Sequence, residues 1–215
     1  MPQLAPERVI ELHRVVIFQV AKIDVVEQVF KAHVYFEWVI SGGAKDEALA
    51  AKENTMTKGV EYESGPHSGK KWPVVPSAMW YLENQFNWSN AIELDTKEIK
   101  VLTSKDDLVL IRRVMGEFQA LMPLHQFPVD VQSLELSVEI QCAANGPFPV
   151  AALVSPSFSG THMERGFMPQ LSWHSSPALH AKVVDTLLDM GPTNSKVYPT
   201  FKVALVVART LPVNP

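Results

Sequence analysis

ALMPLHQFPVDVQSL, residues 120–134, is a turn-forming stretch that leads into a strand with one buried face. Phe127-Pro128 favours an extended or turning backbone, because proline fixes φ and lacks an amide donor. Asp130 and Gln132 can satisfy backbone groups of such a loop. Apolar and polar residues then alternate with the period of a strand, which predicts a buried row. That row is expected to contain Leu134, Leu136, Val138 and Ile140.

Similar strand-like runs, separated by Pro, Gly, Asn and Ser turns, fill most of the chain and predict an all-β fold. A hairpin is predicted from strands at 14–21 and 28–40, with its turn at 22–27. Helix is expected only near the N-terminus, at about Pro6–His13, and in the Ala-rich stretch Ala44–Met56.

The second strand of this hairpin is predicted to have two chemically different faces. Alternate residues on one face are apolar, and they are expected to lie in the core: Ala32, Val34, Phe36 and Trp38. The opposite face is polar, and it is either the solvent-facing side of the sheet or part of a binding surface. Its members are His33, Tyr35 and Glu37.

Composition excludes several classes of protein. The chain has 215 residues, which suits one large all-β domain or two small ones. Its single cysteine excludes an internal disulfide framework, and its net charge of -4 with mixed signs gives no surface for nucleic acid. It has no apolar run long enough for a membrane helix and no signal-peptide apolar region. Hydrolase and phosphate-loop motifs are absent, and the histidines are too scattered to predict a metal site. Neither an enzyme nor a cofactor is expected.

The stretch 120–134 resembles the signature loop of pentameric ligand-gated ion channels, the Cys-loop receptor superfamily. Most animal members close this loop with two cysteines, whereas this chain has Ala120 and Leu134 at those positions. That departure resembles the branch, common in prokaryotes, that lacks the disulfide. The resemblance covers nearly the whole chain, and it implies an immunoglobulin-like β-sandwich of about ten strands with a short N-terminal helix.

The resemblance also implies a ligand site between adjacent subunits. Its principal side would include the loop at 70–90, Gln141 and the hairpin tip at 187–199. Many family members have an aromatic residue at the position of Gln141. The complementary side would lie on the polar face of the second strand. The residues implied as ligand contacts are Trp80, Tyr81, Glu83, Gln141 and Tyr198 on the principal side, and His33, Tyr35, Glu37 and Ile111 on the complementary side.

A second implied constellation couples ligand binding to pore opening. Asp24 or Glu27 in the hairpin turn, Asp130 in the signature loop and Arg209 at the end of the last strand would meet near the membrane. A guanidinium held by two carboxylates is a strong link when it is partly shielded from water. The resemblance further implies a homopentamer, a membrane pore domain after Pro215 and a location on the extracellular or periplasmic side of the cell membrane.

Three alternatives remain open from the sequence. One is a soluble pentameric binding protein of the same fold, similar to acetylcholine-binding proteins. Another is a channel domain gated by protons, since histidine and shifted carboxylates titrate in the useful pH range. The third is an unrelated carbohydrate-binding or adhesion β-sandwich, which would be a monomer.

Overall fold

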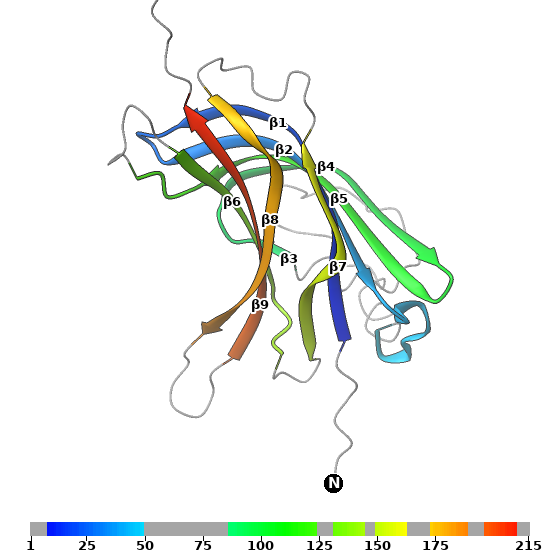
Figure 1. The fold of residues 1–215 in the computed structure, drawn as a ribbon. Helices are drawn as coiled ribbons and strands as arrows, with labels where there is room; N and C mark the ends of the chain where they lie inside the picture. Colours follow the sequence, from blue (N-terminus) through cyan, green and yellow to red (C-terminus); the bar gives the residue numbers. More distant parts are fainter. Residues whose placement is uncertain are drawn as a thin grey trace, which may run out of the picture.

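The structure is a computed structural model, and it contains two β-sheets packed face to face (Figure 1). The all-β sandwich expected from the sequence is confirmed. The residues that the structure describes are 8–49, 86–123, 131–144, 149–162, 173–188 and 196–209.

The first sheet has five strands in the order β4-β5-β2-β1-β7. Its central strand β2 pairs antiparallel with both β1 and β5, and β1 pairs on its other side with β7 in parallel. The strands of this sheet are β1 (Arg8–Asp24), β2 (Val29–Ile40), β4 (Ala91–Ser104), β5 (Asp107–Gln119) and β7 (Val150–His162).

The second sheet has four strands in the order β3-β6-β9-β8. β8 and β9 pair antiparallel, which confirms the predicted hairpin, although its tip at 189–195 lies outside the described residues. The strands of this sheet are β3 (Phe86–Trp88), β6 (Val131–Ile140), β8 (Trp173–Leu188) and β9 (Lys196–Arg209).

The core lies between the sheets, and both predicted apolar rows contribute to it. Alternate residues of β2 and β6 are buried as expected, because a strand places every second side chain on the same face. Trp38 is fully buried and contacts the rings of Phe36 and Phe86, with ring centroids 5.1 and 4.6 Å away. Cys142 and Trp173 are also buried.

The predicted N-terminal helix is wrong, since strand β1 begins at Arg8. Ile10 and Leu12 are buried while Val9 and Glu11 are only partly covered, which is the period of a strand. Because β1 pairs with β2 on one side and β7 on the other, sheet hydrogen bonds outweigh local helix propensity here. The hairpin itself is confirmed, with a first strand longer than predicted and residues 25–28 in the turn.

Among the described residues, helix occurs only in the region after β2. A 3-10 turn, η1 (Gly43–Lys45), is followed by three helical residues, 47–49. Asp46 caps them by accepting a hydrogen bond from the Leu49 amide at 3.0 Å, and it also pairs with the buried Arg8 guanidinium. The rest of the predicted helix Ala44–Met56 lies outside the described residues.

Candidate functional site

The four residues expected on the complementary side lie together on the outer face of the five-stranded sheet. Glu37 of β2 pairs directly with Ile111 of β5 in the strand ladder. Tyr35 and His33 follow on the same side of β2, since alternate residues point the same way. The polar row predicted from the sequence is therefore a continuous surface of two neighbouring strands.

A hydrogen bond joins two of these residues. The Tyr35 hydroxyl donates to Glu37 Oε2 at 2.8 Å. Burial and this bond raise the pKa of Tyr35 above its usual range, so Tyr35 remains a hydrogen-bond donor at neutral pH. The guanidinium of Arg14, on β1, lies over the Tyr35 ring at 6.0 Å from its centroid.

His33 is part of a second cluster with Arg113 and Phe18. Arg113 Nε donates a hydrogen bond to His33 Nε2 at 2.6 Å, so this nitrogen accepts and the ring is neutral. Burial and the Arg113 charge lower the pKa of His33. Phe18 contacts both partners, with its centroid 4.9 Å from the His33 ring and 4.8 Å from the Arg113 guanidinium carbon.

Sequence reasoning missed Arg14, Phe18 and Arg113. Arg113 could have been found by alternation, because Leu110 and Val114 are buried and the odd-numbered residues of β5 point outward. Phe18 could not, because its place depends on a β-bulge between Ile17 and Gln19 that shifts the register of β1.

Two residues expected on the principal side lie near each other at the far end of the four-stranded sheet. The β6–β9 ladder ends at the pair Glu139 and Thr200, and Gln141 and Tyr198 each lie two residues beyond that pair. A backbone hydrogen bond of 2.8 Å from the Ala144 amide to the Val197 carbonyl holds the same region. Gln141 is exposed and Tyr198 is partly buried.

The remaining principal-side candidates, Trp80, Tyr81 and Glu83, lie outside the described residues. For the described candidates, the two sides belong to different sheets. His33, Tyr35, Glu37 and Ile111 lie on the outer face of the five-stranded sheet. Tyr198 lies on β9 of the four-stranded sheet, and Gln141 directly follows β6 of that sheet. Since the outer faces of a sandwich point in opposite directions, the two sets cannot surround one ligand within a single chain.

The β1–β2 turn contains the acidic residues expected in coupling. Asp24 accepts hydrogen bonds from the amides of Val26 and Glu27 at 3.1 and 3.0 Å, which fixes the turn. Lys22 Nζ pairs with Asp24 at 3.0 Å and with Glu27 at 3.7 Å. The Glu27 amide and the Lys22 ammonium hold the pKa of Asp24 below its usual range.

Arg209 lies at the end of β9, at the same end of the sandwich as this turn (upper left in Figure 1). Its guanidinium carbon lies 5.0 Å from the Trp173 ring centroid. Val131, which follows Asp130 in the sequence, pairs with Ala208, the neighbour of Arg209. Asp130 lies outside the described residues, and among those that the structure describes no ion pair joins Arg209 to Asp24 or Glu27.

Gln28 attaches the turn to the start of the signature loop. It has a positive φ of 59°, and its carbonyl accepts a hydrogen bond from the Ala120 amide at 2.9 Å. Its side-chain amide donates to the carbonyls of Met122 and Val25 at 2.9 and 2.6 Å and accepts from the Met122 amide. The turn and the residues just after β5 are therefore held as one unit.

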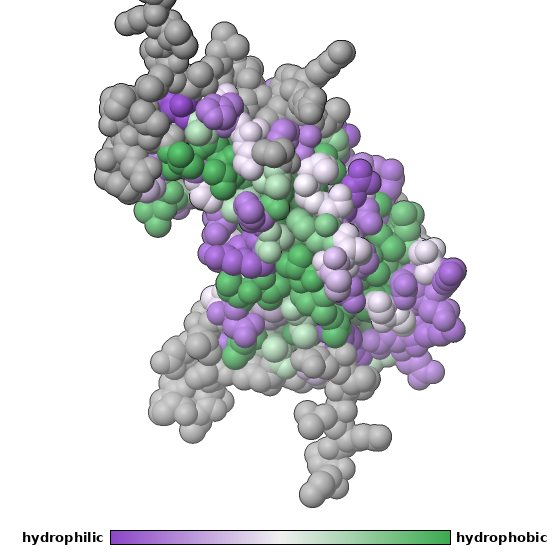
Figure 2. Space-filling view, in the orientation of Figure 1, coloured by the Kyte–Doolittle hydropathy of each residue, from purple (hydrophilic) through white to green (hydrophobic). Residues whose placement is uncertain are grey.

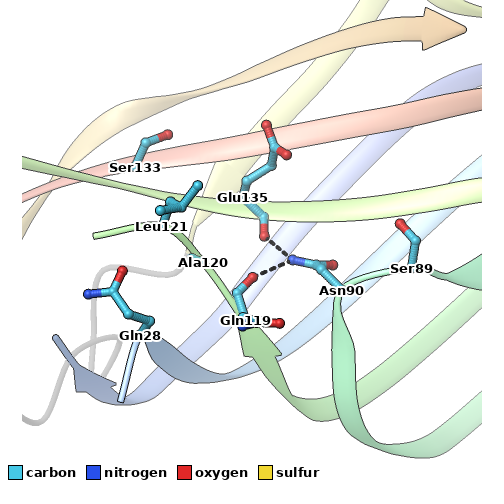
Figure 3. A pocket seen from close by; sticks show the side chains of 8 residues that line it. All are labelled: Gln28, Ser89, Asn90, Gln119, Ala120, Leu121, Ser133 and Glu135. Carbon is cyan, nitrogen blue, oxygen red and sulfur yellow. Dashed lines mark hydrogen bonds between the residues drawn. The ribbon is translucent and has the colours of Figure 1, made fainter. Parts of the chain in front are cut away.

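A pocket of about 550 Å³ opens beside this unit (Figure 3). Asn90, in the turn between β3 and β4, lies at its wall and joins both sheets. The Asn90 amide donates to the carbonyls of Gln119 and Glu135 at 2.9 and 2.6 Å, and its side-chain oxygen accepts from the Ser137 amide at 3.0 Å. Sequence reasoning did not identify this role, because the three partners are distant in sequence.

Large apolar side chains are unusually exposed at the same end. Val26 in the turn, Leu121 after β5 and Val131 at the start of β6 are 81, 89 and 50% exposed. Isolated apolar residues are common on surfaces, but three on adjoining segments suit contact with an apolar partner.

Comparison with models of known protein families and with curated proteins finds no match for this chain. In the described ranges, no helix is long and apolar enough to cross a membrane. The same ranges contain no group of three or more His, Cys, Asp or Glu residues arranged to hold a metal ion.

Proposed function

We propose that this chain is the ligand-binding extracellular domain of a pentameric ligand-gated ion channel of the prokaryotic type. The observation that carries the proposal is the division of the candidate ligand contacts between two sheets. His33, Tyr35, Glu37 and Ile111 lie on the outer face of the five-stranded sheet, whereas Tyr198 lies on β9 and Gln141 follows the end of β6, two strands of the other sheet. A site that uses both sets needs two copies of the chain.

Contact between unlike faces of identical chains is head-to-tail. Such contacts form a closed ring when the rotation from one subunit to the next divides a full turn evenly. The resemblance of the sequence specifies five subunits, which gives a homopentamer with one small-molecule site at each interface. An apolar region on the visible face, where β7 and β9 lie in Figure 1, supports subunit contact (Figure 2).

The end that contains the β1–β2 turn, the signature loop and Arg209 would face a membrane pore domain that follows Pro215. The exposed Val26, Leu121 and Val131 support an apolar partner there. The domain would then lie on the extracellular or periplasmic side of the cell membrane. A ligand that binds the open state more tightly shifts the closed–open equilibrium by its difference in affinity.

Head-to-tail assembly predicts a specific result for two surface variants. Ile111→Glu places a charge on the outer face of the five-stranded sheet, and Tyr198→Glu does so on the four-stranded sheet. Each variant alone should remain monomeric under conditions where the wild-type domain forms rings. An equimolar mixture should contain heterodimers, because each pair retains one intact contact. Light scattering over a concentration series measures the mass, and particle images reveal the symmetry of the wild type.

Twofold dimers of the wild type would contradict the proposal, and so would variants that assemble as the wild type does. Lys105→Gln, an exposed change in the turn between β4 and β5, is the control and should leave assembly unaltered. Fivefold rings from a gene that encodes no membrane helices would instead identify a soluble pentameric binding protein.

The coupling role of Arg209 has a separate test in a protein that includes the pore. Arg209→Gln should abolish most ligand-evoked current at equal surface expression, because it removes the charge that the proposal places between two carboxylates. Lys202→Gln removes a charge from the same strand, where Lys202 pairs with Glu135 at 2.6 Å, and should leave the current nearly unchanged. Normal currents from the Arg209 variant would refute the coupling role.

A further inference from the structure

We propose that Arg113 is the anchor of a binding site for a small organic carboxylate on the outer face of the five-stranded sheet. This inference rests on the proposed function only for its location at a subunit interface. The chemistry of the site comes from the contacts of Arg113 and its neighbours within one chain.

Arg113 is held in a fixed orientation. Its Nε donates a hydrogen bond to His33 at 2.6 Å, and its guanidinium carbon lies over the Phe18 ring, 4.8 Å from the ring centroid. In the part of the chain that the structure describes, its two terminal nitrogens make no hydrogen bond or ion pair. A guanidinium that is held at its Nε and against an aromatic ring is pre-organised to bind a carboxylate through two parallel hydrogen bonds from its terminal nitrogens.

The carboxylates nearest to Arg113 are bound to other groups. Glu98 is opposite Arg113 in the ladder, but its carboxylate pairs with Lys100. Glu37 accepts the Tyr35 hydroxyl. Two further acidic residues on this face form ion pairs with lysines, Asp95 with Lys97 and Glu117 with Lys31, and Glu93 is opposite Glu117, two outward positions along β5 from Arg113. Arg113 is therefore a half-buried cation that forms no ion pair with these carboxylates. An anion from solution can form that ion pair instead.

The surroundings favour an organic carboxylate over an inorganic anion. Phe18 lies on one side of Arg113, and Tyr35, its partner in the β2–β5 ladder, lies on another. Arg14 lies over the Tyr35 ring and makes no ion pair within the described residues, so a second guanidinium is available nearby. Aromatic rings provide contact for a carbon body, whereas phosphate or chloride would gain only from the charges.

The test compares two nearly isosteric probes, benzoate and benzamide, by NMR titration of the purified domain, with the His33 ring signals as the local reporter. Benzoate should bind saturably and shift the His33 signals, while benzamide should not. Arg113→Gln should weaken benzoate binding about tenfold, equivalent to about 1.4 kcal/mol, and Arg14→Gln should weaken it less. Lys182→Gln removes a positive charge from the other sheet and should have no effect.

Equal binding of benzoate and benzamide would overturn the inference, and so would unchanged benzoate affinity in both arginine variants. Displacement of benzoate by equimolar phosphate would reduce the site to a general anion site and would also overturn it. Arg14→Gln keeps the test decisive if Arg113→Gln does not fold. Light scattering of the same samples separates the two proposals: benzoate binding by a domain that forms no rings supports the carboxylate site and contradicts the pentamer.

Discussion

Trp38→Ala is expected to lower the free energy of unfolding by about 3–5 kcal/mol, the range for removing a large buried aromatic side chain. Trp38 is 0% exposed and lies at the centre of the sandwich. It contacts Phe36 on its own strand and Phe86 and Phe201 on the opposite sheet. Alanine would leave a cavity that rings from two rigid sheets cannot fill. Urea unfolding followed by circular dichroism measures the difference.

Trp38→Phe distinguishes the contribution of ring packing from that of the buried indole N–H. The indole N–H of Trp38 is buried, and it has no hydrogen-bond partner among the described residues. Phenylalanine removes this unpaired donor and part of the ring, so its cost should be only about 1 kcal/mol. Leu102→Ala, at a side chain that is 48% exposed on β4, is the control and should change stability by less than about 0.5 kcal/mol. A Phe variant as unstable as the Ala variant would contradict this account of the core.

Asn90→Ala is expected to cost about 2–4 kcal/mol, because it leaves two carbonyls and one amide without their protein partner. These groups belong to Gln119, Glu135 and Ser137, so the change loosens β5 from β6. Asn90→Asp has almost the same shape, yet it places a carboxylate against two carbonyl oxygens. It should therefore be at least as destabilising as alanine, which a role in shape alone would not predict.

Asn87 provides the matched control for Asn90. It lies on β3, three residues earlier, and its side chain is exposed. Asn87→Ala should change the free energy of unfolding by less than about 0.5 kcal/mol. Thermal and urea unfolding of the three variants measure these effects, and equal losses from Asn87→Ala and Asn90→Ala would refute the specific link between the sheets.

The sequence predicts which faces of individual strands are buried, because side-chain alternation is local. Phe36 and Leu136 are in the core as expected, while Tyr35 and Glu135 point outward. Alternation also places His33, Tyr35 and Glu37 in one row. The prediction at the N-terminus was wrong because the local sequence around Glu11 is compatible with both helix and strand. The strand forms because β1 pairs with β2 on one side and with β7 on the other.

Long-range partners explain what the sequence could not predict. The contact of Arg113 with Phe18 depends on a bulge in β1, and the bonds of Asn90 reach residues 29, 45 and 47 positions away. Such contacts have no periodic signal in the chain. The ion pair between Arg8 and Asp46 is similar, since it joins the first described strand to a helix cap 38 residues later.

The parallel pairing of β1 with β7 has a consequence for synthesis of the protein. β1 can pair with β2 soon after both have left the ribosome, but its other edge must wait for residues 150–162. The ribosome must add more than a hundred residues after β1 before β7 can cover this edge of β1. An unpaired edge invites association with other nascent chains. Truncations that end before β7 should therefore aggregate, and slower translation upstream of β7 should lower the yield of folded domain.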